Sequence, residues 1–146
     1  MKIFVTVGTT EFHQLTDALA TTEYLAGHEL TIQCGSVRPK EKREGVVVFD
    51  YTNCISNLIE NADLIISHAA AGTRLDVLGH SKPHIMVCND SLAGNHQMEM
   101  VRANKRNQSC RVFECVEDFL EYLKTANLEE ECKKMSQFIT NQAAGE

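Results

Sequence analysis

Short, almost purely apolar runs alternate along the chain with longer segments whose apolar residues recur every three or four positions. A continuous apolar run is typical of a strand buried on both faces, whereas the longer spacing predicts a helix with one buried face. The sequence predicts strands at residues 2–7, 29–33, 46–50, 64–67, 84–88 and 110–113. It predicts helices at residues 12–26, 55–62, 73–80, 95–107, 116–124 and 128–140.

Alternating strands and helices predict an α/β fold with a parallel sheet. The strands are apolar on both sides, as at residues 46–49 and 64–66, so we expect helices on both faces of the sheet. The length fits one domain, and we predict a single Rossmann-like domain over residues 1–146 with a mostly parallel sheet. Ligands of such folds bind at the carboxyl ends of the strands, so the loops after the strands are the candidate functional segments.

Composition and charge narrow the classes of function. The formal net charge is −6 and the basic residues are scattered, whereas a nucleic-acid surface needs clustered Lys and Arg, so we expect no nucleic-acid partner. No run approaches the roughly 20 apolar residues that span a bilayer, and residues 1–8 are typical of a strand rather than a signal peptide, which favours a cytosolic chain. The six cysteines form no Cys-x-x-Cys pair and are expected to be free, packed thiols.

The most informative loop follows the fourth predicted strand. After His68, the chain passes through small residues into a helix that begins near Gly72. Small residues let a ligand approach the backbone, and the free N–H groups of a helix's first turn attract anions. Asp76 lies one turn further on, on the same face as Gly72 and Thr73, where a carboxylate can accept hydrogen bonds from ribose hydroxyls. Thr73 can cap this helix, and the loop predicts a phosphate or nucleotide site; the alternative is an Asp76 that only favours the helix dipole and a buried structural His68.

Two other loops carry groups that suit the same ligand. Gly8-Thr9-Thr10 follows the first strand, with two hydroxyls that can bind an anion or cap the next helix. After the fifth strand, Asn95-His96-Gln97 opens a helix with side chains that donate and accept hydrogen bonds, as recognition of sugar hydroxyls requires. An ordinary turn with a Thr cap and an asparagine cap are the respective alternatives.

Several chemistries lack their sequence motifs. The chain has no G-x-G-x-x-G fingerprint of dinucleotide binding, no P-loop, no Asp-x-Asp pair for a divalent ion and no G-x-S-x-G elbow of serine hydrolases. No Cys/His quartet has zinc spacing, and Pro83 prevents one helix from presenting both His80 and His84. We therefore expect no metal and no cofactor.

The order of motifs along nearly the whole chain resembles one family. The motifs are F-V-T-V-G-T-T at residues 4–10 followed by Phe12, A-D-L-I-I-S-H-A at 62–69 followed by Ala71 and Gly72, L-D-x-L at 75–78, Lys82-Pro83, and N-H-Q-x-E at 95–99. They resemble the cytosolic catalytic subunits of the UDP-N-acetylglucosamine (UDP-GlcNAc) transferase that makes the second sugar addition to the dolichol diphosphate carrier for N-glycosylation. The bacterial transferase that adds GlcNAc to the lipid-linked muropeptide belongs to the same wider group.

The resemblance implies a fold, a reaction and a partner. The fold would be the C-terminal, donor-binding half of a GT-B glycosyltransferase, in which two Rossmann-like halves face each other across a cleft. The reaction would be an inverting, metal-independent transfer of GlcNAc from UDP-GlcNAc to a lipid-diphosphate-linked sugar acceptor, GlcNAc-diphosphodolichol. A membrane-anchored glycosyltransferase subunit would supply the other half and recruit the chain to the cytosolic face of the endoplasmic reticulum.

The resemblance also assigns residues to the donor site. The loop after the first strand and the helix start at Gly72 would receive the diphosphate, Asp76 would hold the ribose where the family usually has Glu, and Ala70 stands where Gly is usual. The predicted donor-binding residues are Gly8, Thr9, Thr10, His68, Ala71, Gly72, Thr73, Asp76, Asn95, His96 and Gln97. Glu11 and His13 are candidates for the base that takes the acceptor proton, with a role as helix-start residues as the alternative. We expect the base, or much of the acceptor site, to come from the partner.

The sequence allows two interpretations of the C-terminal segment and two alternative functions. Leu128, Cys132, Met135 and Ile139 form an apolar stripe at helical spacing, which predicts packing either on the chain's own sheet or on the partner. Two alternative functions are a bacterial exopolysaccharide transferase subunit that acts on an undecaprenyl-linked acceptor, and a nucleotide-sugar-binding module without activity of its own.

Overall fold

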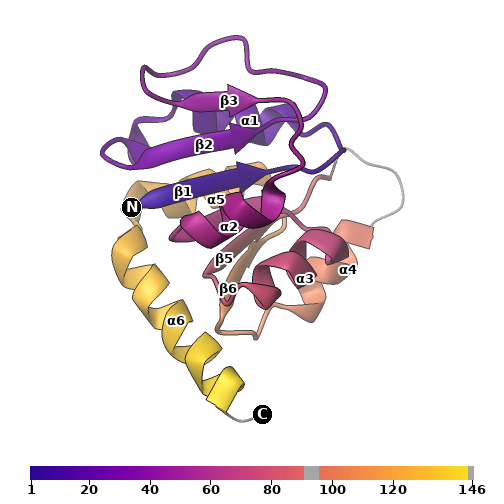
Figure 1. Ribbon diagram of the computed structural model, residues 1–146, viewed down its shortest axis with the longest axis vertical. Coiled ribbons are helices and arrows are strands. Elements are labelled where there is room, and N and C mark those ends of the chain that lie inside the picture. Colours follow the sequence, from indigo (N-terminus) through magenta and orange to yellow (C-terminus); the bar gives the residue numbers. More distant parts are fainter. Residues whose placement is uncertain (91–95, 145–146) are drawn as a thin grey trace.

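The computed structural model describes residues 1–90 and 96–144 and contains a six-stranded parallel sheet (Figure 1). The strands lie in the order β3-β2-β1-β4-β5-β6, and each pairs in parallel with its neighbours. This order reverses between β1 and β4, which is the switch point where Rossmann-like folds bind their ligands. The strands are β1 (Lys2–Thr6), β2 (Glu29–Gln33), β3 (Val47–Phe49), β4 (Leu64–His68), β5 (His84–Val87) and β6 (Cys110–Phe113).

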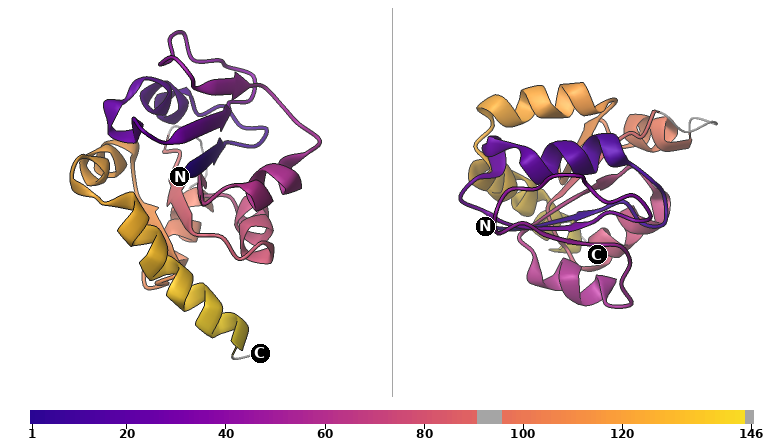
Figure 2. Two further views of the ribbon diagram at one scale, coloured as in Figure 1. Left: turned by 60° about the vertical axis from the view of Figure 1, so that its left-hand side comes forward. Right: turned by 90° about the horizontal axis from the view of Figure 1, so that it is seen from above.

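Helices cover both faces of the sheet (Figure 2). They are α1 (His13–Thr21), the 3₁₀ helix η1 (Glu23–Leu25), α2 (Ile55–Asn61), α3 (Ala71–Gly79), α4 (His96–Ala103), α5 (Val116–Thr125) and α6 (Leu128–Ala144). Side chains of α1, η1, α5 and α6 share one buried cluster with the strands, whereas α2 and α3 pack in a second cluster and α4 in a third. The central strands are thereby buried on both sides, as their apolar sequences predict.

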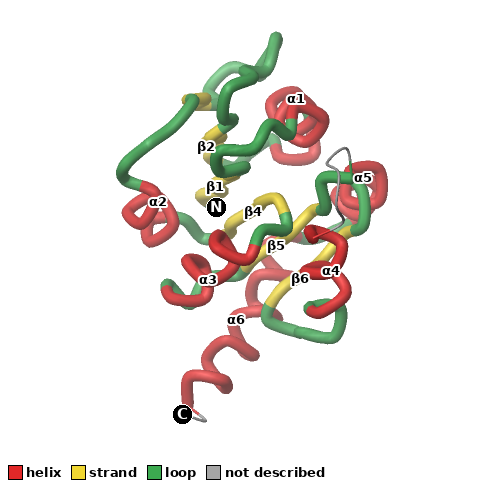
Figure 3. The backbone as a smooth tube through the Cα atoms, turned by 90° about the vertical axis from the view of Figure 1, so that its right-hand side faces the viewer, coloured by secondary structure: helices red, strands yellow, loops and turns green. Residues whose placement is uncertain are grey.

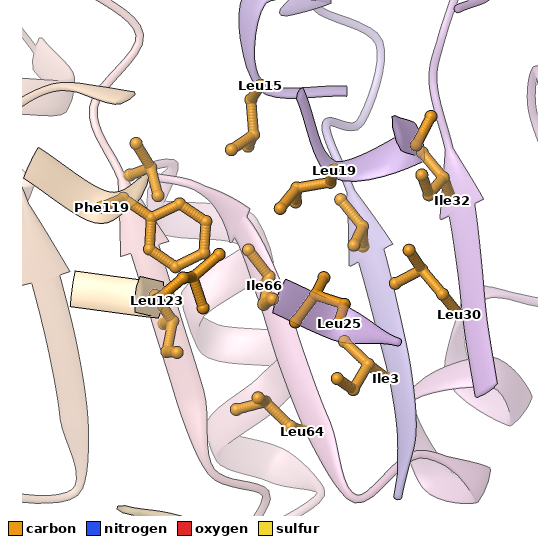
Figure 4. Close-up of a cluster of buried hydrophobic side chains, with 14 of the residues drawn as sticks. Ile3, Leu15, Leu19, Leu25, Leu30, Ile32, Leu64, Ile66, Phe119 and Leu123 are labelled. Carbon is orange, nitrogen blue, oxygen red and sulfur yellow. The ribbon is translucent and has the colours of Figure 1, made fainter. Parts of the chain in front are cut away.

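The larger core lies under α1 and α5 (Figure 4). Leu15 and Leu19 of α1 and Phe119 of α5 are fully buried against strand residues such as Ile3 and Ile66. Alternate residues of β1 face opposite sides, so Phe4 joins the second cluster, beneath α2 and α3. Burial of each such Leu or Phe side chain stabilises the fold by roughly 1.5–3 kcal/mol.

The predicted α/β fold is confirmed. Some helix boundaries differ from the predicted ones, for reasons that lie in the local backbone. The helix predicted at residues 12–26 is two helices, because Thr22 adopts an extended backbone and its hydroxyl accepts a hydrogen bond from the Tyr24 N–H, which caps η1. The helix predicted at 95–107 ends at Ala103, where the amide of Asn104 turns back to donate to the Met100 carbonyl. Its predicted first residue, Asn95, lies outside the described residues.

The C-terminal apolar stripe packs largely on the chain itself. Leu128, Cys132 and Met135 are buried in the larger core, and Ile139 is half-buried. The structure therefore favours packing on the chain's own sheet over docking to a partner for the first three of these residues. The far end of α6 projects beyond the sheet (Figures 1 and 2).

The cysteines and the length and hydropathy of the helices were both subjects of the predictions above. All six cysteines are free thiols, as predicted, and four of them are buried. Across residues 1–90 and 96–144, no helix has the length and apolar character needed to cross a membrane.

Candidate functional site

A pocket of about 230 Å³ opens at the carboxyl end of the sheet, between the ends of β1 and β2 and the helices α2 and α3. Figure 3 looks onto this edge, where loops join the ends of the strands to the helices. The pocket is lined by Thr6, Gly8, Thr9, Gln33, Tyr51, Thr52, Ile55, Ile59, Thr73 and Asp76. The predicted donor residues Gly8 and Thr9 thus share one pocket with Thr73 and Asp76, although more than sixty positions separate the two pairs in the sequence.

Contacts with His68 and Gln33 fix the conformation of the loop at Gly8. Gly8 has a φ of +62°, a left-handed conformation that favours glycine, and a Cβ added there would lie 3.3 Å from the His68 ring. Its N–H donates to the Gln33 side-chain oxygen (3.0 Å), so this N–H is already used within the fold. The Thr9 side chain is exposed and lines the pocket. Neither Thr9 nor Thr10 caps the next helix, because α1 begins after Phe12 without a side-chain cap.

Among residues 1–90 and 96–144, no hydrogen-bond partner is found for the first N–H groups of helix α3. Its N-cap residue is Ala70, which makes no side-chain cap, and its first turn contains no acidic residue. The predicted Thr73 cap is therefore wrong, and the N–H groups of Ala71, Gly72 and Thr73 keep the donors that an anion would use. A Cβ added at Gly72 would meet no atom within 4 Å, so the Gly72 side of the turn is open.

His68 is a neutral side chain that joins the two loops. It is buried, its Nε2 lies 3.3 Å from the Thr73 hydroxyl, and its ring packs against Gly8. Burial lowers the His68 pKa to about 4, so the ring carries no charge near neutral pH. His68 therefore shapes the pocket without offering a positive charge to a phosphate.

Asp76 faces a wall that sequence reasoning missed. Its carboxylate is exposed and lines the pocket together with Tyr51 and Thr52, which follow β3. Tyr51 is 55% exposed although it is aromatic. Tyr51 and Thr52 follow a predicted strand, which is the one feature of the sequence that could have indicated them. No phosphate-binding or sugar-binding pattern marks this segment.

Gln97 connects the loops that follow β4 and β5. Its side-chain oxygen accepts hydrogen bonds from the N–H groups of Ala69 (3.1 Å) and Asn89 (2.9 Å). His96 beside it is exposed, with its Nδ1 3.7 Å from a Glu99 carboxylate oxygen. Because the Gln97 oxygen is already hydrogen-bonded to the backbone, only the amide nitrogen is available for the predicted contact with a sugar. That contact stays a prediction.

Glu11 and His13 form a pair at the same edge, outside the pocket. The Glu11 carboxylate lies 2.7 Å from His13 Nδ1, and both side chains are exposed. The Asn89 side chain donates to the Glu11 carbonyl (2.9 Å), which ties this pair to the loop after β5. A carboxylate that orients an imidazole is the arrangement of a general base, so the geometry keeps both residues as candidates.

A larger groove, of about 1140 Å³, lies at the opposite end of the sheet. It runs between α6 and the segments that precede β4 and β5, with Asp63, Lys82, Glu129 and Lys133 in its lining. Asp63 there accepts a hydrogen bond from the backbone N–H of Lys2. This groove is remote from the carboxyl ends of the strands, so its size does not make it the nucleotide site. Within residues 1–90 and 96–144, no group of three or more His, Cys, Asp or Glu side chains could hold a metal ion.

Comparison with known proteins places this geometry in a family. Residues 2–145 match the model of the glycosyltransferase family 28 C-terminal domain. The UDP-N-acetylglucosamine transferase subunit ALG13 of Mus musculus is 35% identical over 130 residues, which are 78% of this chain and 11% of that protein. The chain therefore spans about a tenth of the length of this relative.

Solved structures agree with the fold. An NMR solution structure of ALG13 matches with a TM-score of 0.58 and 22% identity, covering 87% of this chain and 85% of that one. A UDP-glucose:anthocyanidin 3-O-glucosyltransferase in complex with UDP matches with a TM-score of 0.71 and 16% identity, covering 96% of this chain and 34% of that one. Because its family model extends over nearly its whole length, the chain belongs to the glycosyltransferase family 28 C-terminal domain family.

Proposed function

We propose that this chain binds UDP-GlcNAc and is the donor-binding half of an inverting transferase that adds GlcNAc to a lipid-diphosphate-linked sugar. One observation carries the proposal: a single pocket joins the exposed Asp76 carboxylate, the Tyr51–Thr52 wall and Thr73 in the first turn of α3. The names of the relatives, which are UDP-N-acetylglucosamine transferase subunits, support the choice of donor.

Each part of a UDP-sugar has a matching feature in the pocket. The N–H groups at the start of α3 suit the diphosphate, since they carry partial positive charge and no side chain caps them. Asp76, less than two turns further along α3, suits the ribose hydroxyls, because a carboxylate accepts two hydrogen bonds at once. Tyr51 lines the same pocket as Asp76 with an exposed aromatic ring, on which a flat nucleobase can stack.

The same start of α3 would assist the chemical step. When the sugar leaves, negative charge grows on the UDP diphosphate, and donors fixed in the backbone stabilise that charge without reorganisation. The base that takes the acceptor proton, or much of the acceptor site, belongs in this proposal to a membrane-anchored partner at the cytosolic face of the endoplasmic reticulum. The word subunit in the relatives' names supports a complex of this kind. The Glu11–His13 pair is the candidate base within this chain.

Nucleotide binding by two variants tests the proposal. Asp76→Ala removes charge-assisted hydrogen bonds and is expected to weaken UDP and UDP-GlcNAc alike, by about tenfold. Gln97→Ala is expected to weaken UDP-GlcNAc more than UDP, because the amide nitrogen would contact only the sugar, whereas loss of the bonds to Ala69 and Asn89 affects both ligands. Isothermal titration calorimetry of the full chain measures both affinities, and Glu130→Ala, an exposed carboxylate on α6, is the matched control. Unchanged UDP affinity in a folded Asp76→Ala variant would contradict the assigned pocket.

The partner is tested by a transfer assay. The full chain is mixed with a membrane-anchored candidate subunit, a GlcNAc-diphospholipid acceptor and either UDP-GlcNAc or UDP-glucose. Product is expected only with partner and UDP-GlcNAc together. Full-rate transfer by this chain alone would place the base here, and a loss of that rate in His13→Gln would then identify it.

A further inference from the structure

The side chain of Gln33, which no motif marks, stands at the centre of the contacts that shape the pocket. Gln33 is the last residue of β2 and is only 3% exposed. Its oxygen accepts hydrogen bonds from the Thr6 hydroxyl (2.6 Å) and the Gly8 N–H (3.0 Å). Its nitrogen donates to the carbonyls of Gly8 (2.8 Å) and Asp50 (2.6 Å). All four positions of the amide are therefore used.

Two of these bonds clamp Gly8 from both sides of its backbone. The N–H and the carbonyl of Gly8 meet the oxygen and nitrogen of the same amide, which the positive φ of Gly8 allows. This clamp sets the position of Thr9, the next residue and an exposed part of the pocket lining.

A third bond fixes the opposite wall. The carbonyl of Asp50 immediately precedes Tyr51 and Thr52, and it also accepts from the Gly35 N–H (3.0 Å). The Gln33 amide thus links the Gly8–Thr9 loop to the Tyr51–Thr52 wall across the end of β2. Both walls are hydrogen-bonded to the planar amide of Gln33, so this amide constrains the distance between them.

We propose that Gln33 is a positioning residue for the donor site, which sets the distance between the Gly8–Thr9 loop and the Tyr51–Thr52 wall and so tunes affinity for a uridine diphosphate ligand. The inference rests on the proposed function of this pocket. Glutamine suits the task because a neutral amide both accepts and donates twice. A glutamate would place a charge 2.6–2.8 Å from two carbonyl oxygens, and a methionine would remove all four hydrogen bonds of the amide.

The affinity test uses Gln33→Met, with Ser109→Ala as the control that loses a buried hydrogen bond far from the pocket. UDP affinity is measured by calorimetry at a temperature where circular dichroism shows each full-length variant folded. Gln33→Met is expected to bind UDP about tenfold more weakly, and Ser109→Ala as well as the original chain. A folded Gln33→Met with UDP affinity within twofold of the original would overturn the proposal.

The variant Gln33→Glu gives a readout that a merely structural role would not produce. Burial and the nearby carbonyls raise the pKa of the new carboxyl, so it becomes protonated, and again a donor, as the pH falls. Its UDP affinity relative to the original chain is therefore expected to rise severalfold between pH 8 and pH 6.5. A constant ratio over this range would count against positioning by the amide, and this variant serves if Gln33→Met does not fold.

Backbone NMR of the ligand-free chain separates this inference from the function it rests on. In Gln33→Glu at pH 8, the amide resonances of Thr9 and Tyr51 are expected to shift together and to return toward their original positions at pH 6.5. Such shifts in a chain that does not bind UDP would refute the proposed ligand and leave the link between the walls intact. Resonances that stay unmoved would refute the link itself.

Discussion

Two buried polar networks lie on either side of the switch point and differ in charge. The Gln33 network (Gln33, Thr6, Gly8 and the Asp50 carbonyl) is neutral, and every position of its central amide is hydrogen-bonded. The Arg74 network (Arg74, His84, Ser67 and Ser109) surrounds a guanidinium that is only 4% exposed. The first network positions a loop at the pocket, and the second buries a charge beneath α3.

The hydrogen bonds of the Arg74 network have one consistent direction. Ser67 donates its hydroxyl proton to the His68 carbonyl, so the hydroxyl oxygen accepts from His84 Nε2 at 2.7 Å. His84 Nδ1 is then the unprotonated nitrogen that accepts from Arg74 at 3.1 Å. Burial and the neighbouring Arg74 charge accordingly hold the His84 pKa well below its ordinary value.

The charge of Arg74 has no counterion among residues 1–90 and 96–144. Its two terminal nitrogens donate to His84 and Ser109, while Nε has no hydrogen-bond partner in the described part of the chain. Burial lowers the Arg74 pKa, yet a guanidinium stays protonated. The difference between the networks indicates that a satisfied amide can fix a site at little electrostatic cost, whereas a buried cation makes its region sensitive to truncation and to acid.

The largest expected effect is on stability, from truncation of Arg74. Arg74→Ala leaves a cavity and removes the partners of His84 and Ser109, which is expected to lower the free energy of unfolding by about 2–4 kcal/mol. Arg74→Met fills the space without a charge and is expected to cost less than half of that, since the desolvation of the cation disappears. Urea unfolding measures both. Equal losses in the two variants would mean that the charge is not a liability.

Acid sensitivity is the second expected effect. The His68 pKa is about 4 and the His84 pKa is lowered further below its ordinary value, whereas both are near 6.5 in the unfolded chain. The unfolded chain therefore binds more protons below pH 6.5, so stability is full above that pH and falls as the pH falls toward 4. His68 alone is expected to contribute a loss of about 3 kcal/mol by pH 4.

Urea unfolding at pH 7.5, 6.5, 5.5 and 5 follows this loss in the window above the carboxyl pKa values. Arg74→Met is expected to flatten this pH profile, because the Arg74 charge is one cause of the low His84 pKa. A stability that stays constant from pH 7.5 to 5 would show that neither buried ring resists protonation.

Neither network could be predicted from the sequence, although the fold could. The apolar runs and helical spacings predict the elements because they depend on neighbouring residues, and the small-residue turn after β4 marks the start of α3 for the same reason. Gln33 stands out in no local pattern, since its partners Gly8 and Asp50 lie 25 and 17 positions away. Arg74 occupies an ordinary helical position, and its burial depends on how α3 meets His84.

The pocket was predictable in part for similar reasons. Asp76 and the start of α3 lie within one local strand–turn–helix segment, so their shared role is visible in the sequence. Tyr51 joins them only because β3 lies at the edge of the sheet and the chain returns through α2. The Thr73 cap was wrong because Ala70, which has no polar side chain, occupies the N-cap position.

The smallest expected effects come from two variants that each remove one hydroxyl, and they distinguish the positioning role of the Gln33 network from the supporting role of the Arg74 network. Thr6→Val and Ser109→Ala each remove one buried hydroxyl, and each is expected to lower the free energy of unfolding by about 1 kcal/mol. Thr6→Val loosens the Gln33 oxygen beside the pocket, so UDP affinity is expected to fall about threefold, as one partner of the clamp is lost. Ser109→Ala is expected to leave UDP affinity unchanged, because the Arg74 network touches α3 below its open start. Urea unfolding and calorimetry on the same two variants measure both quantities. If both lowered UDP affinity equally at matched stability, affinity would follow overall stability, and the distinction between a positioning network and a supporting one would fail.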